Sequence, residues 1–360
     1  MADAIAEQIA ALKDEDWAVR EEAATALGTY RDARAVGPLV SLLRDSDRAV
    51  REAAIGALTS IGKPCVPAMG LCLADPQSGV QEAASAILAA VGDDRVLAPL
   101  IASLDNRNWI VRMHAARALG RIKDPGSVMP LIPLLQDRVK AVREEATTTL
   151  ASIGEEAVPP LLEALTHAEW LVRLHTVEAL GKMRSPAAVE PLLSLLFNDP
   201  DSAVREDAIR ALGRIGDARA LEFLEIAMKE PGLRPVAVEA MGEIGDRRAV
   251  TVLIKVLEGL DRPEESRIVA GCGDKWDEEM MTRSLAVRAL GMIGDEHAIP
   301  SLLKALHQTV TRADAAAALT KFGSKVVAPL LTIMTQESDE NMRFHVKDAL
   351  TKVGWRPGRI

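Results

Sequence analysis

Hydrophobic residues recur at helical spacing along most of the chain. Between Asp47 and Gly62, apolar residues such as Val50 and Leu58 are spaced by three and four positions, which is typical of a helix with one buried face. Asp47 is a residue type that caps helix N-termini, and Gly62 is one that ends helices. Residues 36–43 show the same spacing over a shorter stretch. The pattern therefore predicts a short helix followed by a longer one.

This two-helix pattern repeats at nearly constant intervals. Most copies have a Val-Arg pair, or a close variant, followed by small residues and Leu-Gly. The anchor position is occupied by Arg20, Arg51, Gln81, Arg112, Arg143, Arg173, Arg205, Arg234, Arg283, Arg312 and Arg343. Neighbouring anchors are 29 to 32 residues apart, except for the 49 residues between Arg234 and Arg283. Such a period indicates a repeat protein with eleven units.

One pair of helices cannot bury its apolar face alone, whereas stacked pairs form a continuous core. We therefore expect an all-α fold, an α-solenoid (superhelix) of about eleven two-helix repeats. Repeats one to eight are predicted at residues 1–258 and an insertion loop at residues 259–282. Repeats nine to eleven and a C-terminal cap are predicted at residues 283–360, within one continuous solenoid.

The repeat motif resembles that of a known family. The stretch from Asp201-Ser-Ala-Val-Arg205 through Gly213-Arg-Ile-Gly216-Asp217 is similar to the HEAT repeat, in particular to the short HEAT-like class named after phycobilisome lyase subunits. The resemblance implies a solenoid whose second helices line a concave surface. It leaves function open, because this repeat serves scaffolds, chromophore lyases, a metal hydroxylase and DNA glycosylases.

The recurrent anchor arginines are interpreted as structural residues. Acids recur six positions before the anchor, as at Asp45 and Asp137, and four before it, as at Asp47. Arginines with such partners make charge-assisted hydrogen bonds between stacked repeats and helix N-termini. The Leu-Gly-x-Ile-Gly runs follow helices rather than strands, so we interpret their glycines as helix C-caps and not as phosphate-binding loops.

Variable positions carry the information on function. The residue three before the anchor is Trp17, Trp109 or Trp170 in three repeats and mostly charged or polar elsewhere. Exposed tryptophans along one rim are candidate hot spots for a protein partner. The alternative is that each indole only covers the start of its helix.

The positions just after the anchors are polar and mostly acidic. They include Glu21, Glu52, Glu144 and Glu206, with histidine in the same register at His114 and His175. An acidic surface edged by tryptophan suits a folded protein or a basic peptide as partner; a solvated surface without a partner is the alternative. No metal or other cofactor is expected, because the histidines lie whole repeats apart and lack the adjacent glutamate of HEAT-like hydroxylases.

The extra length after Arg234 predicts the insertion loop at residues 259–282. It contains Cys272 between two glycines, and Trp276. Long loops are often functional, so both residues are candidates for partner binding. A tolerated insertion is one alternative. Thiol chemistry at Cys272, such as bilin addition, is another, although no sequence-adjacent histidine supplies a base.

The overall composition disfavours several classes of protein. A net charge of −9 provides no general Lys/Arg excess, so nucleic-acid binding is not expected. The sequence has no run of about 18 uncharged apolar residues, so a membrane span is not expected. Residues 1–13 do not resemble a secretion signal. Three scattered cysteines favour a reducing, cytoplasmic location.

The leading functional prediction is a non-enzymatic scaffold or adaptor that binds a protein partner on its concave second-helix surface. No nucleophile with a base, phosphate loop or metal cluster appears in the sequence, so no catalytic residue is assigned and no enzymatic activity is expected. A chromophore (bilin) lyase-like subunit is the alternative and requires a bilin-sized apolar pocket near Cys272. A HEAT-like DNA-binding glycosylase is a weaker alternative, because the acidic strip would repel DNA.

Overall fold

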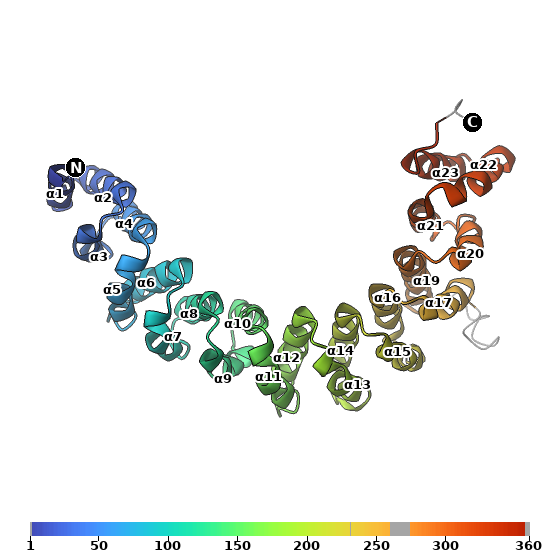
Figure 1. Ribbon diagram of the computed structural model, residues 1–360, viewed down its shortest axis with the longest axis horizontal. Helices are drawn as coiled ribbons and strands as arrows, with labels where there is room; N and C mark the ends of the chain where they lie inside the picture. Colours follow the sequence, from blue (N-terminus) through green and yellow to red (C-terminus); the bar gives the residue numbers. More distant parts are fainter. Residues whose placement is uncertain (1, 231, 260–273, 357–360) are drawn as a thin grey trace. The chain divides into compact units, whose positions relative to one another are not determined.

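The computed structural model describes residues 2–230, 232–259 and 274–356. Throughout these ranges the regular elements are α-helices and short 3-10 helices, and no strand occurs there. Contacts divide the chain into two units, residues 1–179 and residues 180–360. Each unit is built from helix pairs that follow one another in chain order (Figure 1).

The first unit holds six repeats. Its first helices are α1 (Ala2–Ala11), α3 (Val36–Leu42), α5 (Val66–Cys72), α7 (Leu97–Ser103), α9 (Val128–Leu131) continued by η5 (Ile132–Gln136), and α11 (Val158–Ala164). Its second helices are α2 (Trp17–Tyr30), α4 (Arg48–Ile61), α6 (Ser78–Val91), α8 (Trp109–Ile122), α10 (Lys140–Ile153) and α12 (Trp170–Met183), the last of which crosses into the second unit.

The second unit holds five repeats. Its first helices are α13 (Val189–Asn198), α15 (Leu221–Ala227), α17 (Val250–Glu258), α20 (Ile299–Ala305) and α22 (Val327–Gln336). Its second helices are α14 (Ser202–Ile215), α16 (Arg234–Ile244), α19 (Asp274–Ile293), α21 (Arg312–Leu319) and α23 (Glu340–Lys352). The described residues thus contain eleven helix pairs, and the predicted all-α solenoid of eleven two-helix repeats is confirmed.

A single 3-10 turn leads into most first helices. These turns are η1 (Ala33–Ala35), η2 (Lys63–Cys65), η3 (Asp94–Val96), η4 (Pro125–Ser127), η6 (Glu155–Ala157), η7 (Pro186–Ala188), η8 (Ala218–Ala220), η9 (Arg247–Ala249) and η10 (Glu296–Ala298). Many begin at an aspartate cap; Asp32, for instance, accepts a hydrogen bond from the backbone N–H of Arg34. The second helices are capped in the same way, as at Asp47 before α4 and Asn108 before α8.

The two glycine positions of the Leu-Gly-x-Ile-Gly motif have different roles, as Gly62 and Gly28 show, which come from copies that each keep one of the two. The second is the predicted C-cap: Gly62 follows α4 with φ 74°, a backbone conformation that favours glycine. The first is a packing residue, so the prediction that both glycines are caps is wrong. A Cβ on Gly28 in α2 would lie 2.8 Å from the Cα of Ala57 in α4. Glycine at this position therefore lets adjacent second helices pack closely.

The predicted insertion, residues 259–282, is described only at its two ends. Gly259 ends α17 in the left-handed conformation. Residues 260–273, which include Cys272, lie outside the described residues. From Asp274 onward the chain is helical, so the last nine residues of the predicted loop belong to α19 instead. Glutamate, lysine and methionine in this stretch are good helix formers, and α19 extends beyond the boundary that the repeat spacing suggested.

One stretch, Arg312–Gln336, has the length and hydropathy of a membrane-spanning helix. In the structure it is divided into α21, η11 (Thr320–Val326) and α22, because Gly323 has the non-helical angles φ 59° and ψ −135°. Leu319 and Leu330 from this stretch are fully buried. The stretch therefore supplies helices to two neighbouring repeats.

Candidate functional site

Several anchor arginines join consecutive repeats, as Arg112 and Arg20 show. Arg112 of α8 donates two hydrogen bonds to the Asp137 carboxylate of the next repeat, at 2.6 and 2.8 Å. Its third nitrogen donates to the carbonyl oxygens of Asn106 and Arg107, which precede α8. Arg20 forms the same contacts with Asp45. The structural interpretation of the anchors is therefore confirmed.

One junction replaces both members of this pair. Gln81 stands at the anchor position of α6, and Asn106 stands at the position where several other repeats, such as those with Asp45 and Asp137, have an aspartate. The Asn106 amide nitrogen donates to the Gln81 side-chain oxygen at 3.1 Å, and Gln81 donates to the Asp75 carbonyl oxygen at 2.7 Å. A neutral amide pair thus keeps the arrangement that a charged pair has elsewhere.

The three predicted tryptophans each begin a second helix. Trp17, Trp109 and Trp170 are the first residues of α2, α8 and α12, and they are 49%, 39% and 41% exposed. Two repeats lie between those of Trp17 and Trp109, so the structure does not gather all three tryptophans. Trp109 and Trp170 lie two repeats apart, with Lys140 at the start of the helix between them. Their role in partner binding stays a prediction.

The predicted acidic residues lie on the second helices as expected. Glu21 is half-buried on α2. The other three form ion pairs one helical turn away within their own helices, Glu52 with Arg48, Glu144 with Lys140, and Glu206 with Arg210. Such surface pairs contribute little to stability, and they leave the predicted partner-binding role untested.

His114 lies at the centre of a polar cluster that spans three second helices. Its Nδ1 lies 3.2 Å from the Ser85 hydroxyl of α6, and that hydroxyl donates to the Glu82 carbonyl oxygen at 2.8 Å. One turn further along α8, Arg117 donates to the Glu145 carboxylate of α10 at 2.6 and 3.1 Å. We call these five residues the His114 cluster.

The hydrogen bonds determine the protonation of His114. Because Ser85 donates its only proton to Glu82, its oxygen accepts from a protonated Nδ1, and Nε2 of His114 keeps its lone pair. Burial, and next the charge of Arg117, lower the pKa of His114 below its usual 6.5. The imidazole is therefore neutral at pH 7. The cluster combines a neutral base with a partly exposed cation, Arg117, and the carboxylate of Glu145.

Part of this cluster was missed at the level of sequence. Ser85 stands four positions after the anchor, where most repeats have an apolar or alanine side chain, such as Ala24 or Ala116. A hydroxyl residue at that position, together with a histidine two positions after the anchor of the next repeat, was the signal available in the sequence. The Arg117–Glu145 pair joins the same adjacent second helices, α8 and α10.

His175, in the same register as His114, is packed rather than exposed. It is 8% exposed and bridges two helices: Arg143 of α10 donates to its Nε2 at 3.3 Å. Its Nδ1 lies 3.4 Å from the Glu178 carboxylate. This burial argues against the partner-binding role that the sequence suggested, because a partner could reach little of the ring.

The described thiols are unreactive. Cys65 is fully buried near the Leu58 carbonyl oxygen, and burial raises the pKa of its thiol to about 11. Burial likewise raises the pKa of Cys72. Both stay protonated at neutral pH, and the thiolate is the nucleophilic form. Cys272 lies outside the described residues, and Trp276 lies in α19 with its side chain outside the described part.

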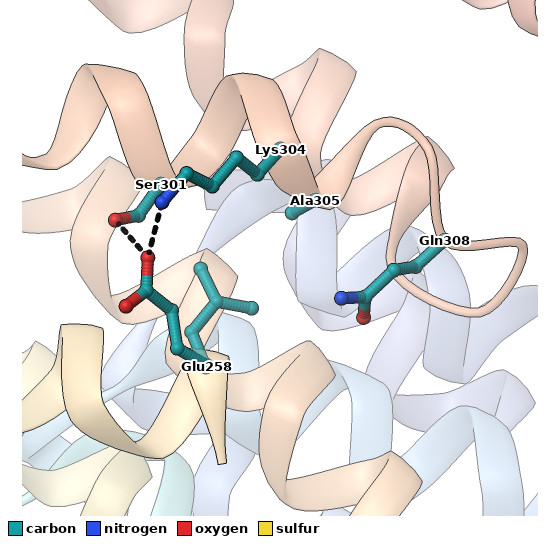
Figure 2. Close-up of a pocket in the computed structure, with 6 residues that line it drawn as sticks. Glu258, Ser301, Lys304, Ala305 and Gln308 are labelled. Atoms are coloured by element: carbon teal, nitrogen blue, oxygen red, sulfur yellow. Dashed lines mark hydrogen bonds and ion pairs between the residues drawn. The ribbon is translucent and has the colours of Figure 1, made fainter. Parts of the chain in front are cut away.

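A hollow of about 340 Å³ lies between α17 and α20 (Figure 2). Ser301 and Lys304 of α20 donate to the Glu258 carboxylate at 3.0 and 3.2 Å, and Gln308 lines the same hollow. The hollow is at the small end of the range for ligand sites. Within the described ranges, no group of three or more His, Cys, Asp or Glu side chains could hold a metal ion.

Solved structures with the same architecture include karyopherins. Kap95p, in a structure that reports its binding to RanGDP, matches 98% of this chain with a TM-score of 0.65 and 15% identity. The match covers 57% of Kap95p. At this identity the likeness concerns the fold alone.

Relatives with higher identity have bilin-related names. The phycocyanobilin lyase subunit beta of Thermosynechococcus vestitus is 31% identical over 172 residues, which are 41% of this chain and 80% of that protein. The bilin biosynthesis protein PecE of Nostoc is 34% identical over 32% of this chain and 45% of its own length. The phycocyanobilin lyase subunit alpha of Picosynechococcus is 31% identical, and this chain spans about half of it, 52%.

These relatives correct the functional prediction. A non-enzymatic scaffold was expected, and no enzymatic activity. Both expectations are wrong, because the similar proteins of stated function are named as lyase subunits and a bilin biosynthesis protein. The sequence contains no recognisable catalytic motif because the repeat itself carries none, and the bilin-related alternative is the better supported one.

Family models describe the repeats themselves. HEAT repeats match residues 5–86, 97–167, 158–233 and 192–271, and a PBS lyase HEAT-like repeat matches residues 282–308. These matches cover well over half of the chain, which therefore belongs to the HEAT-repeat family.

Proposed function

We propose that this protein handles bilins, as a subunit of a lyase that attaches an open-chain tetrapyrrole to a cysteine of an acceptor protein. The observation that carries the proposal is the 31% identity across 80% of a phycocyanobilin lyase subunit. The similarity to a bilin biosynthesis protein supports the same class of ligand.

The state of the described thiols favours an acceptor on another protein. Attachment requires an accessible thiolate, whereas Cys65 and Cys72 are buried and protonated. Neither can receive the chromophore without unfolding of its repeat. Neither described cysteine therefore serves as acceptor, and the proposal assigns that role to a cysteine of a partner protein.

The His114 cluster offers the chemistry that a bilin needs. A bilin is a flat conjugated chain of four pyrrole-derived rings with carboxylate side chains and ring N–H donors. Arg117 can pair with a carboxylate, and the Glu145 carboxylate can accept from a ring N–H. Addition of a thiol across a carbon–carbon double bond forms one C–S bond and moves the thiol proton to carbon. The unprotonated Nε2 of His114 can carry that proton between the two atoms.

The first experiment measures bilin binding directly. Purified protein is titrated with phycocyanobilin, and the change in visible absorption gives the dissociation constant. Arg117→Ala should weaken binding by about tenfold or more, because a charge-assisted hydrogen bond is lost. Arg48→Ala is the matched control, since Arg48 also pairs with a glutamate but lies on α4. The proposal fails if the wild type gives no absorption change, and the site is wrong if both variants bind like the wild type.

The second experiment measures attachment. The protein is incubated with phycocyanobilin and an acceptor phycobiliprotein, and covalent product is detected as colour that survives a denaturing gel. His114→Gln should slow attachment while leaving bilin affinity within about twofold, because the cation that holds the carboxylate is retained. His297→Gln, at an exposed histidine of η10, is the control. Equal attachment rates in the wild type and both variants would exclude His114 as the proton carrier.

A further inference from the structure

Three consecutive second helices of the first unit begin with an aromatic, a cationic and an aromatic residue. These are Trp109 of α8, Lys140 of α10 and Trp170 of α12, all exposed. We call this row the Trp edge. The Arg117–Glu145 pair fixes α8 beside α10, and the Arg143–His175 hydrogen bond fixes α10 beside α12. The three helices follow in this order in Figure 1.

An indole is not needed to begin a second helix. The second helices outside the row begin with Trp17, Arg48 and Ser78, and the middle helix of the row begins with Lys140. Each of these four helices follows an N-cap residue in extended conformation. Each Trp-edge indole is about 40% exposed, although aromatic residues make up only 3% of the chain. Covering the helix start therefore does not require an indole, and the exposed part of each ring offers a surface for contact with a ligand.

The spacing expected for the row fits a polyproline II segment. Packed helices lie about 8–10 Å apart, which places the two indoles about 16–20 Å apart with Lys140 midway. A polyproline II helix has three residues per turn and rises about 3.1 Å per residue. One turn is therefore about 9 Å and two turns about 19 Å. Residues three apart in such a segment would meet Trp109, Lys140 and Trp170 in succession.

The charge of the edge is concentrated on its middle repeat. Arg138 and Lys140 are exposed there, while the Asp137 carboxylate between the helices is already bound by Arg112. Glu144 lies 3.4 Å from Lys140 in an exposed pair that contributes little. In the loop before Trp109 the opposite charges of Asp105 and Arg107 cancel, and the loop before Trp170 carries the negative charge of Glu169. A ligand that matches this pattern is negative at its centre.

We propose that the Trp edge binds an extended, proline-rich segment of a partner protein that carries a carboxylate between two prolines. The prolines lie against Trp109 and Trp170, and the carboxylate pairs with Lys140. Aromatic side chains are the usual surface for polyproline II segments, whose preformed backbone lowers the entropic cost of binding. Peptide capture at this edge goes beyond bilin chemistry and does not require it.

Fluorescence anisotropy with a labelled probe peptide tests the proposal. The probe is a polyproline peptide of roughly ten residues with one aspartate, three residues from a proline on either side. Trp109→Ala and Trp170→Ala should each weaken binding by about tenfold or more. Trp17→Ala is the matched control: it removes the same side chain from the same helix position, but the second repeat after it begins with Ser78. Circular dichroism confirms that each variant is folded.

The remaining probes and variants test the roles of charge, of proline and of the bilin site one at a time. A probe with lysine in place of aspartate should bind more weakly to the wild type and regain affinity for Lys140→Glu. A glycine-rich probe of equal charge should bind more weakly than the proline probe. Arg117→Ala should bind the probe like the wild type, and Trp109→Ala should bind phycocyanobilin like the wild type. Absent binding by the wild type, an equal loss in Trp17→Ala, or equal affinity for the glycine-rich probe would each overturn the proposal.

Discussion

Removing the Arg112 side chain should destabilise the first unit more than any surface charge change. Arg112 and Asp137 are each 9% exposed and share two hydrogen bonds. Arg112→Ala leaves the Asp137 carboxylate buried without its cation, and the carbonyl oxygens of Asn106 and Arg107 lose their donor. Breaking a buried ion pair in this way costs about 3–5 kcal/mol. The exposed Arg48–Glu52 pair offers the comparison, because such a pair contributes only about 0.3–0.5 kcal/mol.

The same perturbation has a defined pH dependence. Burial acts to raise the pKa of Asp137, but the hydrogen bonds and charge of Arg112 hold it below its usual value. A carboxyl with a lowered pKa stabilises the folded state above its unfolded pKa of about 4, and this contribution is lost as the pH falls through the folded pKa. The difference between wild type and Arg112→Ala should therefore be full at pH 7 and shrink below about pH 4.

Unfolding in urea, followed by circular dichroism, measures the difference. Repeat proteins can lose cooperativity, so amide hydrogen exchange of peptides from α8 and α10 should be measured in parallel. Faster exchange is expected there in Arg112→Ala and not in Arg48→Ala. If Arg112→Ala lowers the free energy of unfolding no more than Arg48→Ala does, or if the difference grows at low pH, the account of this pair is refuted.

Three further predictions concern packing, protonation and thiols. Gly28→Ala should lower the free energy of unfolding by about 1–3 kcal/mol, because the new Cβ would contact the Ala57 backbone. Gly56→Ala, whose Cβ meets open space within α4, should raise it by about 0.5–1 kcal/mol. Thermal unfolding compares the two variants. Because the pKa of His114 is lowered in the folded state, the unfolded state takes up the proton at a higher pH. The free energy of unfolding should therefore fall as the pH drops below about 6.5. In urea titrations, His114→Gln should reduce this dependence of stability on pH. Cys65 should react with a thiol reagent only on unfolding, and peptide mass spectrometry that found it labelled in the native protein would contradict its burial.

Much of the fold could be predicted because the same pattern of apolar, capping and anchor residues recurs along the chain. The spacing of the anchors located each pair of helices, and Trp17 and Trp109 stand at the first residue of their second helices, as their register implied. The anchor contacts were equally predictable, since an arginine and an aspartate recur together. Sequence failed at Gly28, because a glycine that caps a helix and a glycine that permits close packing look alike until the neighbouring helix is placed.

The candidate site was less predictable, because it is assembled between repeats. Ser85 and His114 are 29 residues apart in the chain and meet only when α6 stacks on α8. His175 has the same register as His114 but is buried between Arg143 and Glu178. Register alone therefore cannot distinguish an accessible side chain from a packed one, since the neighbours on the adjacent helices decide exposure.

The amide pair of Gln81 and Asn106 limits how this array can be rearranged during evolution. Repeat proteins grow and shrink by duplication and loss of whole units, and each event joins two surfaces that were not neighbours before. If the unit with Gln81 were placed before one with an aspartate, a carboxylate would be buried without a cation. If a unit with arginine were placed before the one with Asn106, a guanidinium would lose its counter-ion. The unit with Gln81 and the unit with Asn106 therefore suit each other better than either suits a unit of the charged type, although Arg143, which meets His175 instead of an aspartate, shows that a joint can also be completed by a histidine.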